Sequence, residues 1–298
     1  MKRLILPFTV LLFSMSGPAQ KAPKRPRVLG ISSVEMYATN AVATRSFYRE
    51  VLDAGGPCHW CEEAPRSPMM VPLNGEQSLM LWSLPTASTS DFLVQITFAT
   101  DNLAAMKRFL TSNGIAFSAP KGVPEIALSD PEGHRIAFTQ YPKVLPSWAL
   151  VYSTLRVIHA GFVVHDRAAE DHFYKDILGF RLYWQGGRQD DETDWVNMQV
   201  PDGTDWIEYM LNVPADASHK TLGVMNHIAL GVPDIHAAEA QLRKNGWSGN
   251  EQPKIGRGGK WQLNLYDPDD TRVELMEFTP THKPCCSEYT GPHPGFKP

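Results

Sequence analysis

The sequence predicts an α+β protein built from four copies of one module, each a strand, a helix and three further strands. Residues 33–56 and 159–180 both show an alternating strand, a polar turn and a helix containing a Phe-Tyr pair. Residues 94–115 and 226–247 both show a strand followed by an amphipathic helix that stops at Asn-Gly. The chain therefore contains an internal repeat, and the repeat determines its architecture.

The ends of the repeats define two domains. Residues 128–142 and 265–280 each predict a strand, an Asp-Pro-acid turn and a second strand. The modules therefore pair into an N-terminal domain at 28–142 and a C-terminal domain at 156–280, joined by a linker at 142–155. Since a sheet of four strands leaves one face uncovered, two modules must curl around a shared interior that can hold a site.

The N-terminal segment predicts export. Residues 1–19 contain Lys2 and Arg3, an apolar core at 4–15 and small residues that end at Ala19, as in a secretory signal peptide. The apolar core is shorter than the roughly 20 residues that span a bilayer. We therefore expect a secreted or periplasmic protein without membrane contact after cleavage, with an uncleaved anchor as the alternative.

The charge balance argues against a nucleic-acid partner. The chain has 28 basic and 32 acidic residues, and removal of residues 1–19 leaves 26 basic residues and every acidic one. No basic run occurs outside the extreme N-terminus, so the sequence offers no surface for gripping phosphates. A small-molecule partner is expected instead, and association into a homodimer stays open.

The four cysteines form two close pairs. Cys58 and Cys61 form a CxxC in a connection rich in Gly and Pro, and Cys285 and Cys286 are adjacent in the tail at 281–298. Because this CxxC does not follow a strand at the start of a helix, structural cysteines are favoured over a redox pair or a zinc knuckle. The pairing of the four thiols stays open, and the Pro- and Gly-rich tail is predicted to be a strap or disordered.

Two histidines and two glutamates occupy equivalent places in the C-terminal repeats. His159 and His227 lie in the first strands of the third and fourth modules, and Glu208 and Glu274 lie in the last strands. A carboxylate in an apolar strand is costly to bury unless a cation compensates it. The four side chains together predict one divalent metal ion, Ni, Zn, Mn or Fe, with positions left open for water or substrate.

With these four positions the sequence resembles the vicinal oxygen chelate superfamily, which includes glyoxalase I, extradiol dioxygenases, methylmalonyl-CoA epimerase and the fosfomycin and bleomycin resistance proteins. The resemblance implies paired βαβββ modules that form two glyoxalase-like domains with curled mixed sheets. It also implies that the metal ligands are His159, Glu208, His227 and Glu274. The matching N-terminal positions are Ser33, Gln95, Ala137 and either Leu79 or Met80, so that domain is expected to be metal-free.

The ligand set favours one reaction class over another. Two histidines with one carboxylate describe an iron site for oxygen chemistry, whereas a second carboxylate suits a Lewis acid that assists proton transfer. Asn264 stands where the resemblance to dioxygenases would require a tyrosine, and the nearest tyrosine is Tyr266. We therefore expect a glyoxalase-like lyase or isomerase with Glu208 or Glu274 as the base. The alternatives are an Fe(II) extradiol ring-cleaving dioxygenase and a non-enzymatic small-molecule or antibiotic binding protein.

Three further residues are candidates for the walls of the site. The glycine-rich loop at 254–262 is either a mobile lid that places Arg257 over an anionic substrate or an ordinary hairpin connection. Trp184 and Trp206 either line the pocket or belong to the core.

Overall fold

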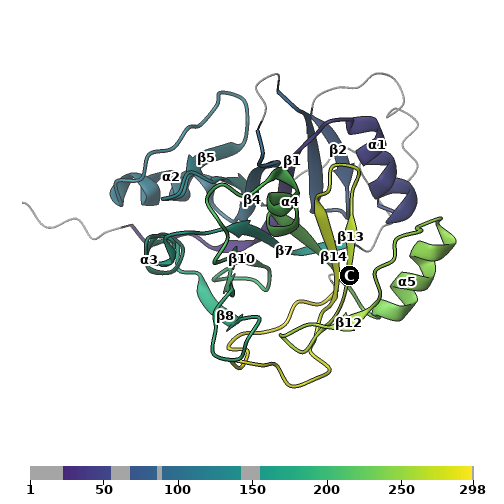
Figure 1. The fold of residues 1–298 in the computed structure, drawn as a ribbon. Helices are drawn as coiled ribbons and strands as arrows, with labels where there is room; N and C mark the ends of the chain where they lie inside the picture. The colour runs from purple at the N-terminus through teal and green to yellow at the C-terminus, as the bar shows by residue number, and fades with distance from the viewer. Residues whose placement is uncertain (1–22, 55–67, 86–88, 142–154, 297–298) are drawn as a thin grey trace, which may run out of the picture.

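The computed structural model describes residues 23–54, 68–85, 89–141 and 155–296, and these residues form two curled mixed β-sheets with short helices beside them (Figure 1). The first sheet has the strand order β2-β3-β1-β4-β6-β5, and the second has the order β12-β13-β14-β11-β7-β10-β9-β8. The predicted α+β class is confirmed. In the described residues, no helix is long and apolar enough to cross a bilayer.

The first sheet is built from the N-terminal half of the chain. Its strands are β1 (Val28–Ala38), β2 (Met69–Pro72), β3 (Ser78–Ser83), β4 (Leu93–Thr100), β5 (Glu125–Ser129) and β6 (Arg135–Gln140). The two predicted modules meet where β1 pairs with β4 in antiparallel register. Within the described residues, only two strands follow the helix in each of these modules, where the sequence predicted three.

The second sheet is built from the C-terminal half. Its strands are β7 (Arg156–Val163), β8 (Arg181–Gly186), β9 (Trp195–Gln199), β10 (Trp206–Met210), β11 (His227–Val232), β12 (Lys254–Ile255), β13 (Trp261–Tyr266) and β14 (Arg272–Glu277). Each of these two modules has the predicted strand, helix and three strands. The two modules meet where β7 pairs with β11 in antiparallel register, as β1 does with β4.

Capped helices connect the strands. They are α1 (Ala41–Ser46), which continues as the π-helix η1 (Phe47–Val51), α2 (Leu103–Ser112), α3 (Arg167–Glu170), which continues as η3 (Asp171–Ile177), α4 (His219–Met225) and α5 (Ile235–Lys244). The polar side chain that precedes each α-helix accepts a hydrogen bond from a backbone N–H of the first turn. These capping residues are Asn40, Asn102, Asp166, Ser218 and Asp234. These caps explain where the helices begin.

The tyrosine of each Phe-Tyr pair links the two halves of the chain. The Tyr48 hydroxyl lies 3.4 Å from Asp267 Oδ2, and the Tyr174 hydroxyl lies 3.2 Å from Asp130 Oδ2. Each aspartate belongs to the Asp-Pro turn of the other sheet, so the first module contacts the fourth and the second contacts the third. The repeat therefore fixes reciprocal contacts between the sheets as well as the order of strands within them.

A buried carboxyl lies beside one of these links. Glu170 is fully buried, its Oε1 accepts the Glu132 N–H at 3.1 Å, and its Oε2 has no hydrogen-bond partner in the described part of the chain. Burial and the neighbouring Asp130 carboxylate raise the pKa of Glu170 from 4.5 to about 8. Ionisation therefore destabilises the folded state progressively as pH rises from the ordinary pKa to the raised one.

Glu170→Gln is expected to raise the melting temperature above pH 8 and to change it much less at pH 5. The amide keeps the shape of the carboxyl group without its charge, so each kilocalorie per mole gained should raise the melting temperature by roughly 2–4 °C. Thermal unfolding at pH 5 and pH 8.5 measures the effect, with exposed Glu50→Gln as the matched control. An equal shift at both pH values would show that the ionisation of Glu170 has no part in stability.

The C-terminal tail crosses the second sheet as a strap, one of the two predicted outcomes. The Thr290 N–H donates to the Tyr183 carbonyl at 3.0 Å, Arg156 donates to the Gly295 carbonyl at 2.7 Å, and Phe296 packs edge-on against Phe278. These contacts hold residues 281–296 against strands β7 and β8 and the end of β14. The tail therefore contributes side chains to the same face of the sheet that carries the predicted ligands.

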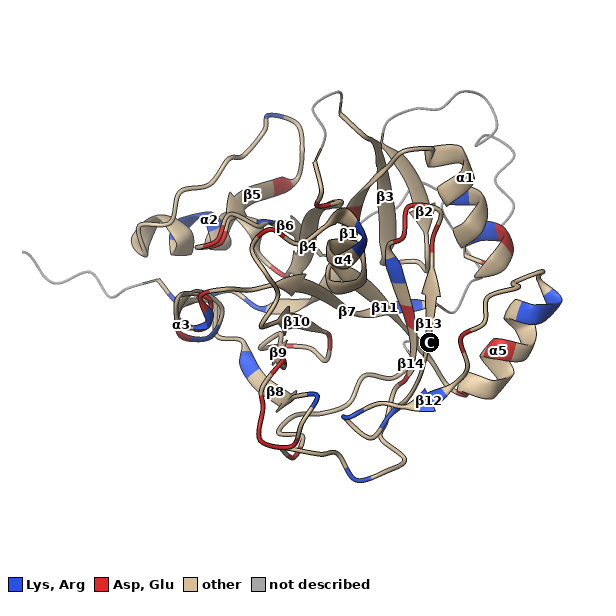
Figure 2. Cartoon of the chain, in the orientation of Figure 1, with Lys and Arg blue, Asp and Glu red and all other residues tan. Residues whose placement is uncertain are grey.

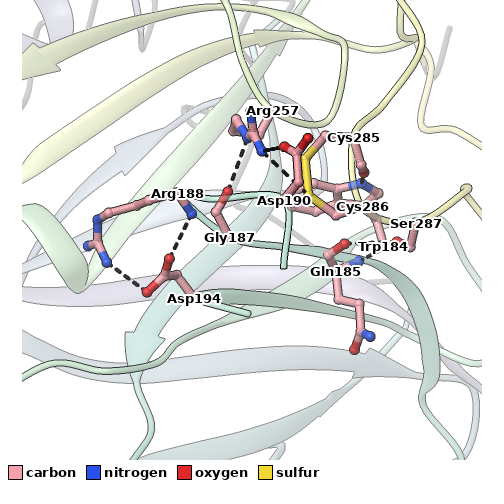
Figure 3. Close-up of a disulfide and its surroundings, with 10 residues drawn as sticks. All are labelled: Trp184, Gln185, Gly187, Arg188, Asp190, Asp194, Arg257, Cys285, Cys286 and Ser287. Atoms are coloured by element: carbon pink, nitrogen blue, oxygen red, sulfur yellow. Dashed lines mark hydrogen bonds and ion pairs between the residues drawn. A yellow bond between two sulfur atoms is a disulfide. The ribbon is translucent and has the colours of Figure 1, made fainter. Parts of the chain in front are cut away.

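A disulfide between Cys285 and Cys286 lies at the start of this strap (Figure 3). The Ser287 hydroxyl bonds to both the backbone N–H and the carbonyl of Gln185 at 2.9 Å, which ties the segment to β8. The Trp184 indole N–H donates to the Cys285 carbonyl at 3.2 Å. The preference for structural cysteines fits this pair, whereas Cys58 and Cys61 lie outside the described residues.

Candidate metal centre

A cavity of about 280 Å³ opens on the second sheet. It combines aromatic walls with charged side chains, and among its lining residues are Trp184, Trp206, Glu208, Lys260, Arg272, Glu274 and Tyr289. Both tryptophans that were candidates for the pocket therefore line it. A concave site with aromatic walls and converging polar groups is typical of small-molecule binding, and this cavity is unusually rich in charged side chains.

The four predicted ligands lie on four adjacent strands. Glu274 is on β14, His227 on β11, His159 on β7 and Glu208 on β10, in the order in which the sheet is assembled. Cross-strand pairing places Glu274 and His159 opposite Ala229, and His227 and Glu208 opposite Gly161. Because directly paired residues share a face, and positions 159 and 161 share one too, all four side chains point to the same side.

The donor atoms of these side chains converge. The Nε2 atoms of His159 and His227 are 3.0 Å apart, and Glu274 Oε2 lies 3.7 Å from each of them. Glu208 Oε2 lies 3.4 Å from His227 Nε2 and 3.9 Å from His159 Nε2. Atoms that each lie about 2.0–2.2 Å from one ion are separated by roughly 3–4 Å. His159, His227 and Glu208 therefore form a donor group that could hold a single divalent ion, and Glu274 lies within 3.7 Å of both imidazoles; Glu274 as a fourth ligand stays a prediction.

The tautomer of His227 suits a ligand. Its Nδ1 lies 2.7 Å from the Met225 carbonyl, which can only accept, so Nδ1 carries the proton and Nε2 presents its lone pair. Arg272 donates to the same Nε2 at 2.9 Å. His159 Nδ1 is buried and finds no partner among the described residues. Burial lowers the pKa of both histidines well below the usual value, so both rings are neutral, as metal ligation requires.

The two carboxylates have different surroundings. Burial raises the pKa of Glu274 to about 7, against the opposing effect of Arg272. Glu208 is paired across the sheet with Asn197. With its amide turned to satisfy both neighbours, Asn197 donates to Glu208 Oε1 at 2.8 Å and accepts the Trp206 indole N–H at 3.1 Å. Asn197 thus fixes one oxygen of Glu208 and leaves the other facing the histidines.

Gly161 makes room for the His227 ring. A Cβ atom at this position would lie 2.2 Å from His227 Cε1, far inside van der Waals contact. The first sheet has Glu35 at the matching position, since Glu35 pairs with Gln95 as Gly161 pairs with His227. The Glu35 carboxylate accepts the Trp82 indole N–H at 2.6 Å and the Gln95 amide at 3.2 Å, so side chains fill this place.

The N-terminal equivalents match the sequence alignment. Strand pairing puts Ser33, Gln95 and Ala137 at the positions of His159, His227 and Glu274. It also resolves the remaining choice in favour of Met80, which pairs with Glu35 as Glu208 pairs with Gly161. This set is poor in metal-binding donors, and a metal-free N-terminal domain stays a prediction.

Gly161→Ala is expected to lower metal affinity by at least about tenfold, as disruption of an outer-shell contact to a ligand commonly does. The added methyl group displaces the His227 ring while the strand itself is retained. Elemental analysis after dialysis against a weak chelator measures the effect, and circular dichroism checks the fold. Gly75→Ala is the matched control because nothing lies within 4 Å of its added methyl group. Equal metal retention in the two variants would contradict this role for Gly161.

The sequence predicts no role for two residues that line the cavity, and it leaves the role of a third open. Arg272 and Lys260 line the cavity, and neither was given a role, although alternation along β14 places Arg272 on the same face as Glu274. Arg257 also lines the cavity, but it is paired with Asp190 and donates to the Gly187 carbonyl at 3.0 Å (Figure 3). This fits the hairpin interpretation of its loop better than a free lid.

Asn264 lies where it was expected. It lines the cavity and pairs across the strands with Glu274. Tyr266 is 40% exposed at the end of β13. The structure thus places an amide, and not this phenol, beside the converging donors.

Comparisons with known proteins agree with this geometry. Residues 156–275 match the family model described as the glyoxalase/bleomycin resistance protein/dioxygenase superfamily. A lactoylglutathione lyase from Haemophilus influenzae is 26% identical over 125 residues, which span 41% of this chain and 93% of that protein.

Solved structures share the fold of both halves. A homoprotocatechuate 2,3-dioxygenase from Brevibacterium fuscum, in its anaerobic complex with 3,4-dihydroxyphenylacetate, has a TM-score of 0.62 and 18% identity, covering 92% of this chain and 85% of that one. The enzyme of the same name from Arthrobacter globiformis has a TM-score of 0.62 and 18% identity, covering 87% of this chain and 82% of that one. At such identity the likeness concerns the fold alone.

Proposed function

Because residues 156–275 match the family model of the glyoxalase/bleomycin resistance protein/dioxygenase superfamily, we propose that the protein is a metal-dependent lyase or isomerase. It moves a proton next to a carbonyl group of a small oxygen-chelating substrate. The observation that carries this proposal is the convergence of two carboxylates, Glu208 and Glu274, on the pair of imidazoles. A second carboxylate is what distinguishes this donor set from a facial triad for oxygen chemistry.

His159, His227, Glu208 and Glu274 would hold the ion, Ni, Zn, Mn or Fe. When bound, a divalent ion acts as a Lewis acid that polarises the carbonyl oxygen of a substrate. The donor chemistry fits, since both imidazoles are neutral and the His227 lone pair faces the other donors.

Glu208 is the better placed of the two candidate bases. Its side chain is 11% exposed against 4% for Glu274, and both residues line the cavity. Asn197 holds Glu208 Oε1, so Oε2, the oxygen that faces the imidazoles, is the one that would exchange a proton with the substrate. Trp184, Trp206 and Tyr289 form the aromatic part of the cavity wall.

The second candidate function is an Fe(II) extradiol dioxygenase. His159, His227 and Glu274 favour it, because two imidazoles and one carboxylate form a subset suited to iron, and the homoprotocatechuate dioxygenases share the fold. Glu208 and Asn264 weigh against it. A non-enzymatic binding protein is the third alternative, and it predicts ligand binding without turnover.

Export remains a proposal carried by residues 1–19, which lie outside the described part of the chain. An exported enzyme would meet small extracellular or periplasmic compounds. A homodimer likewise stays a proposal.

The reaction class is tested by reconstituting metal-free protein separately with Ni, Zn, Mn or Fe(II) and assaying α-hydroxycarbonyls, hemithioacetals and catechols. We expect turnover with at least one redox-inert ion, without oxygen uptake and with solvent deuterium appearing at the carbon next to the carbonyl. Turnover restricted to Fe(II) with stoichiometric oxygen uptake would establish the dioxygenase instead. Binding without any turnover would favour the third alternative.

A further inference from the structure

Basic residues follow one side of the site, on β12, on β14 and in the turn that joins β12 to β13 (Figure 2). They are Lys254, Arg257, Lys260 and Arg272, and all four line the cavity. Arg257 is paired with Asp190, and Lys254 is exposed. Lys260 and Arg272 are the two whose charges remain to be explained.

Lys260 is a buried cation with little to bind. It is 1% exposed, and its Nζ lies 4.8 Å from the ring centre of Trp206, 5.2 Å from that of Tyr289 and 5.5 Å from that of Tyr183. Aromatic faces attract an ammonium group electrostatically, but they do not replace the oxygen acceptors that its three N–H donors require. Its one hydrogen bond among the described residues is a long contact of 3.4 Å with the Tyr183 hydroxyl.

Arg272 also has unmet hydrogen-bonding capacity. Its Nε is buried without a partner in the described ranges, and its Nη2 donates to His227 Nε2. A bound ion would take the lone pair of that same nitrogen, so the guanidinium would then need another acceptor. Lys260 lies just before the first residue of β13, and Arg272 pairs with Tyr266 at the last residue of that strand. Glu274 pairs with the middle of β13, so the two cations lie toward opposite ends of the strand from it.

The charges of the site do not balance without an anion. Burial lowers the pKa of Lys260 to about 7. Glu208 and Glu274 would neutralise one divalent ion, which leaves the positive charges of Arg272 and of protonated Lys260. Neither of these forms an ion pair within 4.0 Å in the part of the chain that the structure describes. A buried cation without a counter-ion is unfavourable, so a ligand that supplies negative charge would be favoured strongly.

We propose that Lys260 binds a carboxylate of the substrate, with Arg272 adding to the positive potential, so that the substrate is a small chelating compound with a separate anionic group. This inference rests on the proposed function, because it assumes that the substrate also occupies the metal centre. Trp206 and Tyr289 flank the Lys260 ammonium group at this site. Lys260 is therefore a specificity-determining residue, contributed by a loop outside the strands that carry the ligands.

The test compares two chelators that differ in one charge. Succinic acid monohydroxamate carries a carboxylate remote from its chelating group, and its carboxamide analogue has the same shape without the charge. Calorimetry gives the dissociation constant of each for the metal-loaded protein. We expect the wild-type protein to prefer the carboxylate by at least about tenfold, as expected for a charge-assisted hydrogen bond.

Lys260→Met should reduce that preference to about twofold or less while the carboxamide binds as before, because the methionine keeps the apolar stem of the lysine. Lys244→Met, at an exposed position on α5, should keep the full preference. Equal binding of the two chelators to the wild-type protein would overturn the carboxylate site alone, and this comparison needs no variant. Absence of binding by both would contradict the proposed function and the carboxylate site with it.

Discussion

Replacing His227 by alanine is expected to reduce bound metal from about one ion per chain to less than about a tenth, because an inner ligand of a four-donor site is removed. The Nε2 atom of His227 lies within 3.7 Å of donor atoms from the other three residues, so this imidazole is central to the donor set. Elemental analysis of the purified variant measures the loss. Far-ultraviolet circular dichroism should stay unchanged, because the strands do not depend on the ring.

His236→Ala is the matched control. His236 is exposed on α5, nine residues further along the chain, and its loss should leave metal content as in the wild-type protein. A His227→Ala protein that keeps full stoichiometry would refute the assignment of this residue as a ligand.

Glu208→Gln is expected to lower kcat by roughly 10²–10⁴-fold at saturating metal, the range for loss of a general base. The amide preserves the shape of the side chain but cannot take a proton. Steady-state kinetics over a series of metal concentrations separate a lower kcat from weaker metal binding. The size of the fall in kcat distinguishes the two leading reactions. A dioxygenase that uses only His159, His227 and Glu274 as ligands would depend little on Glu208.

Exposed Glu192→Gln, on the loop before β9, should retain wild-type kinetics. If Glu208→Gln also retained them, proton transfer through Glu208 would be excluded and the dioxygenase alternative would gain support.

The repeat explains why so much of the ligand geometry could be predicted. Once 33–56 is aligned with 159–180 and 94–115 with 226–247, the positions of His159 and His227 in paired strands follow. Strand pairing in the structure reproduces those equivalences, including Gln95 and Ala137 in the first sheet. Alternation within a strand then decides which side chains share the face, because its period of two admits no other arrangement.

The exchange of Gly161 for Glu35 was visible in the same alignment. Gly161 lies two residues after a predicted ligand and aligns with a charged residue in the duplicate. A glycine at such a position indicates that a neighbouring group packs closely against the backbone. In the structure that neighbour is the His227 ring.

Features that depend on loops and on the tail could not be predicted from the strand pattern. The burial of Lys260 depends on Tyr289, which the strap brings across the sheet from a segment without periodicity. Asn197 is close to Glu208 only because β9 and β10 pair in one particular register, and that register is set by the turn between them. The modules of the first sheet, each with two described strands after its helix where three were predicted, likewise depart from a pattern that only the second sheet follows fully.

Anomalous diffraction from crystals of the metal-loaded protein, recorded on both sides of the absorption edge of the bound metal, tests the central claim most directly. The predicted result is a single peak per chain, about 2.0–2.2 Å from Nε2 of His159 and His227 and from a carboxylate oxygen of Glu274, with Glu208 as the fourth ligand. A peak located elsewhere in the chain, or a fully loaded protein without a peak between the two imidazoles, would contradict it.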